Sequence, residues 1–393
     1  MKIENANLKI IKDSRGNDTL EAELFSGGFS VVDSVPAGKS TGSHEAAVLA
    51  PQDALQKFEQ IKPQILTNDW QTQEEFDNFL IPLNGSNLEL VLSLAFARLK
   101  AKTENIELFQ YVNNISQIKI EKFILPKPIL NVINGGVHSG RQDCKLDFQE
   151  FQVIPKTEDF ALGISTAREF YRKLGDCLVD KYGKENVSLG DEAGYSAPFQ
   201  NNEEALDILL DLINENNYLL SIGLDSAATH FYLKEKGVYV LSGKEYLKED
   251  LRKYYLELIE QYGIIFLEDP FEEEDFDLFA ELQKEAKECL IVADDLTTTN
   301  PERLKIAIEK KAGNTILIKP NQIGTLTETL SVVRMAYESG WQAVVSHRSG
   351  ETMDSFISDL AVGIGAWGLK AGAPGAQERL VKYERVLEIG QKI

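Results

Sequence analysis

The chain has 393 residues, of which 43% are hydrophobic and 26% charged, proportions typical of a globular protein with a large core. Its formal net charge of −21 argues against nucleic acid as the main partner, because phosphate backbones are bound by clustered Lys and Arg. A small anion stays compatible with this charge, since a few cations in a pocket outweigh distant charge that salt screens beyond about 10 Å.

The first part of the chain is predicted to form a small α+β domain. Alternating apolar residues between turn signals indicate strands at 6–12, 18–25 and 29–35. Apolar residues spaced by three and four then predict helices at 44–57, 71–81 and 88–103. Two prolines in 125–128 mark a connector, because proline ends helices. We therefore expect two domains, 1–120 and 121–393.

The second part alternates apolar strands with helical segments. The predicted strands are 219–225, 263–269, 290–295, 314–319, 342–347 and 367–370. The predicted helices are 247–261, 273–288, 301–311, 325–338, 352–365 and 377–388. Near-continuous apolar strands between helices indicate a parallel sheet that is buried on both faces. Six such units favour a closed barrel, with an open doubly wound sheet as the alternative.

Charged side chains follow these strands in succession. They are Asp225, Glu268, Asp294, Lys319, Arg348 and Lys370. In a parallel barrel all of these strand ends meet at one face, where active sites are built. A single charge after a single strand would usually start a solvated loop. Six in succession, acids first and bases later, favour a site.

The residue types in this set point to a particular chemistry. Asp225, Glu268 and Asp294 offer three hard oxygen ligands, which suit Mg²⁺, and no His or Cys cluster beside them favours zinc. A desolvated lysine near other cations has a lowered pKa and can act as a base, a description that fits both Lys319 and Lys370. Arg348 offers a planar fork for phosphate or carboxylate. This set fits the removal of a weakly acidic proton next to a carboxylate.

Cysteine usage and the N-terminus bear on the compartment. Cys144, Cys177 and Cys289 are few and far apart, which predicts no disulfide framework and a reducing environment. The first residues lack the apolar run of a signal peptide, and no stretch is apolar enough to span a membrane. We expect a cytoplasmic protein without a membrane span.

Motifs along almost the whole chain resemble those of the enolase family. They are SRGNDT (14–19), VPAGKSTG (35–42), NGGVH (134–138), QEF (149–151), GDE (190–192), LEDPF (267–271), DDLT (294–297), KPNQIGT (319–325), SHRSGET (346–352) and Lys370 with GAP (372–374). Each is weak alone, but SHRSGET and the DDLT and KPNQIGT pair at this spacing are close to diagnostic.

The resemblance implies a fold and an activity. The fold is a C-terminal (β/α)8-type barrel of the enolase kind, preceded by a smaller α+β capping domain. The activity is that of a hydro-lyase that reversibly dehydrates 2-phosphoglycerate to phosphoenolpyruvate in glycolysis and gluconeogenesis. Family members use a lysine base with Mg²⁺. The resemblance also implies two Mg²⁺ per site, the second arriving with the substrate, and a homodimer or an octamer of dimers.

The resemblance also assigns roles to single residues. Lys319 is implied as the base that takes the C2 proton, and Glu192 as the acid at the C3 hydroxyl with Glu150 beside it. The first Mg²⁺ is implied to bind Asp225, Glu268 and Asp294. Ser40, in the loop that closes on the substrate, and a substrate phosphate oxygen are implied to hold the second Mg²⁺. Substrate contacts are implied for His138, Arg348, Ser349, Lys370 and Ser40.

Several positions depart from the family pattern. Ala37 and Lys39 stand where the family usually has Ser and Ala, and the loop before Glu150 is longer. Ala193 replaces a glycine after GDE, which matters if the backbone there needs a positive φ. Arginine, common in the family after GAP, appears as Ala376 or Gln377.

Two alternatives to an active enolase remain at this point. A relative acting on another acid would have no use for the phosphate-binding residues 347–349. A binding or structural protein that had lost turnover would be expected to have lost a metal ligand or the base, and the sequence retains all of them.

Overall fold

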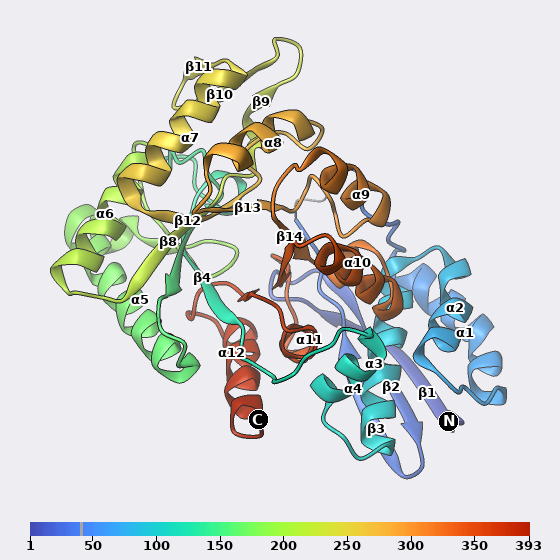
Figure 1. Cartoon of the computed structure of the whole chain (residues 1–393). Helices are drawn as coiled ribbons and strands as arrows, with labels where there is room; N and C mark the ends of the chain where they lie inside the picture. Colours follow the sequence, from blue (N-terminus) through green and yellow to red (C-terminus); the bar gives the residue numbers. More distant parts are fainter. Residues whose placement is uncertain (40–41) are drawn as a thin grey trace.

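The computed structural model describes residues 1–39 and 42–393 (Figure 1). Its N-terminal part is an antiparallel sheet of β1 (Asn5–Lys12), β2 (Asp18–Ser26) and β3 (Phe29–Ser34), as predicted. Four helices follow: α1 (Pro51–Thr67), α2 (Gln73–Leu80), α3 (Ser86–Thr103) and α4 (Leu108–Ser116). Helix α3 packs on β2 and β3 and is buried on nearly every side, as its Leu- and Ala-rich sequence requires.

The helix predicted over 44–57 is wrong at its start. Helix α1 begins only at Pro51, where the proline ring presets the backbone for the first turn. The preceding segment instead follows the barrel, because the amide of Ala46 donates to the Gln322 carbonyl and that of Leu49 donates to the Asn87 side chain. Tertiary hydrogen bonds therefore override the local helical pattern.

The second part is a closed barrel. Six strands stand where they were predicted: β8 (Leu220–Asp225), β12 (Ile264–Glu268), β13 (Leu290–Ala293), β14 (Thr315–Ile318), β15 (Gln342–Ser346) and β16 (Gly368–Lys370). They are joined by β4 (Lys127–Asn134) and β5 (Glu150–Pro155), and pairing of β16 with β4 closes the ring. The open-sheet alternative is thereby excluded.

One barrel strand runs against the others. Strand β5 pairs antiparallel with both β4 and β8, whereas the remaining barrel pairs are parallel. The first residue of β5, Glu150, therefore lies opposite Asp225, the last residue of β8. A residue that begins its strand thus reaches the end of the barrel where the other strands finish.

Apolar side chains fill the barrel and helices surround it. The interior cluster consists of Ile129, Ile154, Phe266, Val292, Leu317 and Val344. The outer helices are α5 (Phe160–Tyr182), α6 (Asn202–Glu215), α7 (Lys248–Tyr262), α8 (Phe276–Glu285), α9 (Pro301–Lys310), α10 (Leu326–Glu338), α11 (Phe356–Ile364) and α12 (Gln377–Gly390). The N-terminal helices lie beside α10 and α11, on the right of Figure 1.

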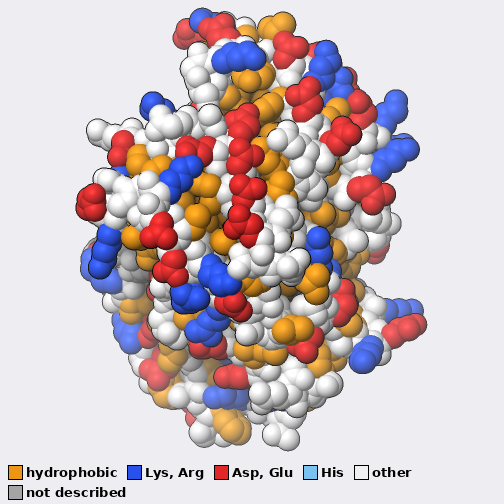
Figure 2. Space-filling model, turned by 90° about the vertical axis from the view of Figure 1, so that its left-hand side faces the viewer, with side chains coloured by type: hydrophobic (Ala, Val, Ile, Leu, Met, Phe, Trp, Pro, Cys, Tyr) orange, Lys and Arg blue, Asp and Glu red, His pale blue; other side chains and the backbone are white. Residues whose placement is uncertain are grey.

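Short strands lie outside the closed ring of the barrel. Strands β6 (Ser188–Leu189) and β7 (Tyr195–Ser196) extend the barrel sheet beside β4, and β9 (Tyr232–Leu233), β10 (Val238–Leu241) and β11 (Lys244–Tyr246) form a small sheet. The face in Figure 2 carries acidic and basic side chains side by side. Within the described part of the chain, no helix combines the length and hydropathy needed to cross a membrane.

Candidate active site

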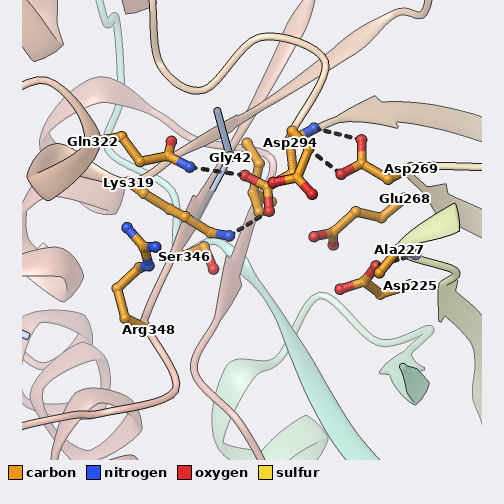
Figure 3. A network of polar contacts seen from close by, with 12 residues as sticks. Gly42, Asp225, Ala227, Glu268, Asp269, Asp294, Lys319, Gln322, Ser346 and Arg348 are labelled. Atoms are coloured by element: carbon orange, nitrogen blue, oxygen red, sulfur yellow. Dashed lines mark hydrogen bonds and ion pairs between the residues drawn. The ribbon is translucent and has the colours of Figure 1, made fainter. Parts of the chain in front are cut away.

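The carboxylates predicted to bind metal meet at one end of the barrel. Asp225 and Glu268 are the last residues of β8 and β12, and Asp294 directly follows β13. Their exposed fractions are 3%, 0% and 6%. Figure 3 shows these three side chains facing Lys319 and Arg348 across the site. Burial, together with the negative charge of Asp225, raises the pKa of Glu268 well above its ordinary value.

The donor set fits a hard divalent cation. Glu268 Oε1 is buried, and among the residues that the structure describes it has no hydrogen-bond partner. Carboxylate oxygens of this kind are the ligands that Mg²⁺ prefers. Asp269 also approaches Asp294 and Asp295, with oxygens within 4.8 Å of one another. Its carboxylate, however, accepts the amides of Asp294 and Asp295 at 3.0 and 2.8 Å, so it holds the turn after β13.

Lys370 lies among the carboxylates. Its Nζ is 3.0 Å from Glu150 Oε2, 3.1 Å from Asp225 Oδ2 and 2.7 Å from Glu268 Oε2. Burial lowers the pKa of this lysine, but the three carboxylates together raise it well above its ordinary value. Lys370 is therefore a permanent cation that partly neutralises the acidic side of the site.

Lys319 follows β14, and its Nζ donates to Asp294 Oδ2. The expectation of a lowered pKa for Lys319 is wrong in this arrangement. Burial and the neighbouring Arg348 and Lys370 act to lower it, but the carboxylate of Asp294 outweighs them and the pKa is raised.

Arg348 and Ser349 lie on the wall of the site opposite the three carboxylates. The Arg348 guanidinium pairs with both oxygens of Glu45 at 3.0 Å and donates to Asn321 Oδ1 at 2.8 Å. The Ser349 hydroxyl accepts the amide of Lys39 at 2.8 Å. Sequence reasoning did not find Glu45, and it placed Asn321 in the KPNQIGT motif without giving it a role. Fixing the arginine fork in one orientation suits bidentate recognition of phosphate.

His138, Glu150 and Glu192 form a second buried group, with one polar atom of each within 4.8 Å of the others. Burial and the charge of Glu192 raise the pKa of Glu150 well above its ordinary value. Burial acts to raise the pKa of Glu192 as well, but His347 and His138 hold it well below its ordinary value. Glu150 therefore binds a proton more tightly than Glu192 does.

Lys39 and Ala193, which depart from the family pattern, lie in loops at the site. Lys39 Nζ donates to the Val137 carbonyl at 2.9 Å and to Asp191 Oδ2 at 2.7 Å, so it ties its loop to two others. Ala193 has φ 62°, the left-handed region that a glycine would occupy more easily, at a cost of about 1 kcal/mol. Ser40 lies outside the described residues.

Two further residues complete the site. His347 and Arg379 are both buried, and the Arg379 guanidinium donates to the ring of His347 at 2.6 Å. Sequence reasoning grouped His347 with the phosphate-binding residues 347–349, and it missed Arg379. The available signal was Arg379, Lys382 and Tyr383 at spacings of three and four, which puts polar groups on the buried face of α12.

An eight-stranded barrel with these groups at one end defines a class of enzymes. Its members abstract a proton next to a carboxylate, with a lysine or histidine base and Mg²⁺. Residues 122–393 match the family model "Enolase, C-terminal TIM barrel domain", and residues 3–112 match "Enolase, N-terminal domain".

Individual relatives agree with the family models. The chain is 40% identical to the enolase of Methanococcoides burtonii, covering 100% of this chain and 95% of the relative. It is 38% identical to the enolases of Methanocaldococcus jannaschii (100% and 96% covered) and Methanococcus aeolicus (97% and 93%). The chain belongs to the enolase family. Its activity is that of a Mg²⁺-dependent hydro-lyase, phosphopyruvate hydratase, acting on a phosphorylated small molecule.

Proposed function

We propose that Lys319 and Glu192 perform the two proton transfers of the dehydration of 2-phosphoglycerate. The observation that carries this proposal is that both side chains line one cavity, together with Asp225, Asp294 and Arg348. Lys319 removes the proton from C2, and the electron pair left there delocalises into the substrate carboxylate. The pair then forms the C2–C3 double bond as the C3–oxygen bond breaks, and the hydroxyl leaves as water with the proton from Glu192.

Glu150 supplies the proton to this step. This role is supported by its raised pKa and by its position beside Glu192, with one oxygen of each carboxyl within 4.8 Å of the other. His138, which is 3.6 Å from Glu192 through Nδ1, bounds the pocket beside the C3 hydroxyl.

The remaining residues bind and orient the substrate. Arg348 and Ser349 hold the phosphate, and Lys370 faces the substrate carboxylate. Asp225, Glu268 and Asp294 hold the first Mg²⁺, which supplies positive charge against the charge that develops on that carboxylate. Ser40 contributes to a second Mg²⁺ that arrives with the substrate.

The wider organisation follows the family. We propose a capping domain of residues 1–120 on a barrel of residues 121–393, assembled as a homodimer or as an octamer of dimers in the cytoplasm. The family resemblance supports the assembly, and the sparse cysteines support the compartment. Light scattering of the purified protein tests the assembly.

Substitution of Lys319 by alanine tests the assignment of the base. We expect Lys319→Ala to lower turnover by at least the roughly 10²–10⁴-fold contribution of a positioned base. It should also stop exchange of the C2 hydrogen with deuterated water, while calorimetry still detects Mg²⁺ binding. Lys310→Ala is the control, because Lys310 pairs with Asp277 on the outer surface. A Lys319→Ala variant with near-normal turnover would remove Lys319 from the mechanism.

A further inference from the structure

Helix α12 contributes a fully buried cation to the site. Arg379 has an exposed fraction of 0%. Its Nη1 donates to His347 Nδ1 at 2.6 Å and to the Arg348 carbonyl at 2.7 Å. Its Nη2 donates to the carbonyls of Ser349 at 2.7 Å and Asp191 at 3.1 Å. One guanidinium therefore joins the loop after β15 to the loop that carries Glu192.

This arrangement is not one that stability alone would favour. The carboxylate that pairs with Arg379 is that of Glu378, at 3.9 Å, so the hydrogen bonds of this buried cation go to neutral groups while the charges of Glu192 and Glu351 act on it from further away. Burying a charge without a close counter-ion is costly. A residue kept under such conditions has a role other than packing.

The contact with His347 fixes the position of a proton. Arginine can only donate hydrogen bonds, so the Nδ1 atom that receives one must carry a lone pair. The ring proton of His347 therefore lies on Nε2 when the ring is neutral, and burial lowers the pKa of His347 to about 4. Nε2 is 3.2 Å from Glu192 Oε2. The ring thus presents an N–H to the carboxylate of the proposed acid.

The Arg379 and His347 side chains pack closely around Gly372. A Cβ atom added to Gly372 would lie 3.0 Å from Arg379 Cδ, 3.0 Å from His347 Cε1 and 3.0 Å from the Glu192 carbonyl oxygen. Asn131 Nδ2 donates to Glu192 Oε2 at 3.1 Å from the other side. The carboxylate of Glu192 therefore lies between the histidine ring, 3.2 Å away, and an amide that donates to it.

We propose that Arg379 is a positioning residue for the dehydration step: by donating to His347 Nδ1 it keeps His347 in the Nε2–H form, which holds Glu192 in place to protonate the leaving C3 hydroxyl. This inference rests on the proposed role of Glu192. It predicts that Arg379 serves the departure of the hydroxyl and leaves the removal of the C2 proton by Lys319 largely unaffected.

The ring form of His347 is measured directly by ¹⁵N NMR of histidine side chains in the intact protein. The chain has 4 histidines, and His347→Gln identifies the signal of His347 by its loss. The wild-type protein should show the Nε2–H form, whereas Arg379→Met should lose this preference. Observation of the Nδ1–H form in the wild-type protein overturns the proposal without any variant of Arg379.

Kinetics separate positioning from general damage to the fold. Arg379→Met should lower the dehydration rate about 10–100-fold, by analogy with the partners that orient metal-bound histidines, with a smaller change in C2 exchange and in KM. Arg379→Lys, which retains a donor, should recover part of the rate and of the Nε2–H form. Equal losses of dehydration and exchange in Arg379→Met would show a merely structural role.

Lys382→Met is the matched control. Lys382 is a second buried cation on the same face of α12, but its Nζ donates to the Thr352 carbonyl and pairs with Glu351, both at 2.6 Å. Its loss should lower stability and leave the ring form of His347 and the ratio of dehydration to exchange unchanged. A shift of the His347 ring form in Lys382→Met would contradict the specific role of Arg379. If Arg379→Met does not fold, Arg379→Lys and the wild-type spectrum test whether Arg379 keeps His347 in the Nε2–H form.

Failure of this inference is distinguishable from failure of the proposed function. Glu192→Gln should abolish dehydration while C2 exchange continues. If Glu192→Gln dehydrates normally, the acid has been assigned wrongly, and the inference about Arg379 falls with it. If Glu192→Gln behaves as expected and Arg379→Met keeps both the Nε2–H form and the wild-type rate, the inference alone fails.

Discussion

At the scale of single residues, the chemistry-bearing side chains were found largely because each follows a strand. Asp225, Glu268 and Lys319 stand at strand ends that the apolar pattern located, so their convergence could be predicted. Glu45 and Arg379 could not be, because each acts on the site from an irregular segment or an outer helix. The helical spacing around Arg379 indicates a buried polar face of α12, but the contacts that Glu45 and Arg379 make with the site depend on the folded chain.

Lys39 departs from the family pattern, and the effect of this residue can be measured. Its ion pair with Asp191 is partly exposed, with side-chain exposed fractions of 35% and 22%, and such pairs contribute roughly 0.2–1 kcal/mol. We expect Lys39→Ala to release the loop and raise KM for 2-phosphoglycerate by up to about fivefold, with kcat changed less. Steady-state kinetics check this. Lys236→Ala, which removes the surface pair with Glu245, is the control. A lowered KM would mean that Lys39 hinders closure.

At the scale of elements, the six strands of the regular alternation were predicted and β4 and β5 were missed. Strand β5 breaks the rhythm because it follows β4 without an intervening helix and runs antiparallel to it. Glu150 and Glu192 therefore looked like surface acids by pattern alone, and only the family resemblance singled them out. The strand direction that brings Glu150 to Asp225 is a property of sheet closure.

The junction of α2 with α10 contains a buried acid. The Asp77 carboxylate, with an exposed fraction of 0%, accepts the Thr327 amide at 2.9 Å and hydroxyl at 2.6 Å and the Gln73 side-chain amide at 2.9 Å. Burial raises the pKa of Asp77 from 3.8 to about 6. Because the folded chain binds this proton more tightly than the unfolded chain, the contribution of Asp77 to stability falls as pH rises from about 4 to about 6.

Asp77→Asn removes this titration. The stability of the variant relative to the wild type should therefore rise by about 2.4 kcal/mol between pH 4 and pH 7, whatever the constant cost of altered hydrogen bonds. Urea unfolding of both proteins at several pH values measures the difference. Asp69→Asn is the control, since the terminal amine lowers the pKa of exposed Asp69 and the trend should be opposite. A difference that does not vary with pH would contradict the account.

At the scale of the whole molecule, the closed barrel gathers negative charge from distant parts of the chain, so metal and stability should be linked. Mg²⁺ that binds the folded chain alone should raise the stability by about 2.7 kcal/mol at a hundredfold excess over its Kd. Thermal unfolding with increasing Mg²⁺ checks this. Asp294→Asn should reduce the increase in unfolding temperature that Mg²⁺ causes. An unfolding temperature that is indifferent to Mg²⁺ in the wild type would argue against the carboxylates as ligands.

The class of fold and the family could both be predicted, because the motifs lie where a barrel brings them together. The particular closure, with one antiparallel strand and an N-terminal part against α10 and α11, could not be, since it depends on packing between segments far apart in sequence. Fold and family together indicate that this end of the barrel is the site of an active, metal-dependent dehydratase.

The most direct test is phosphoenolpyruvate formation from 2-phosphoglycerate, followed by ultraviolet absorbance with Mg²⁺ and then with EDTA. The account predicts rapid formation with Mg²⁺, loss on chelation and recovery when Mg²⁺ is restored. A folded protein saturated with Mg²⁺ that forms no phosphoenolpyruvate, or one whose rate is unaffected by EDTA, would contradict it.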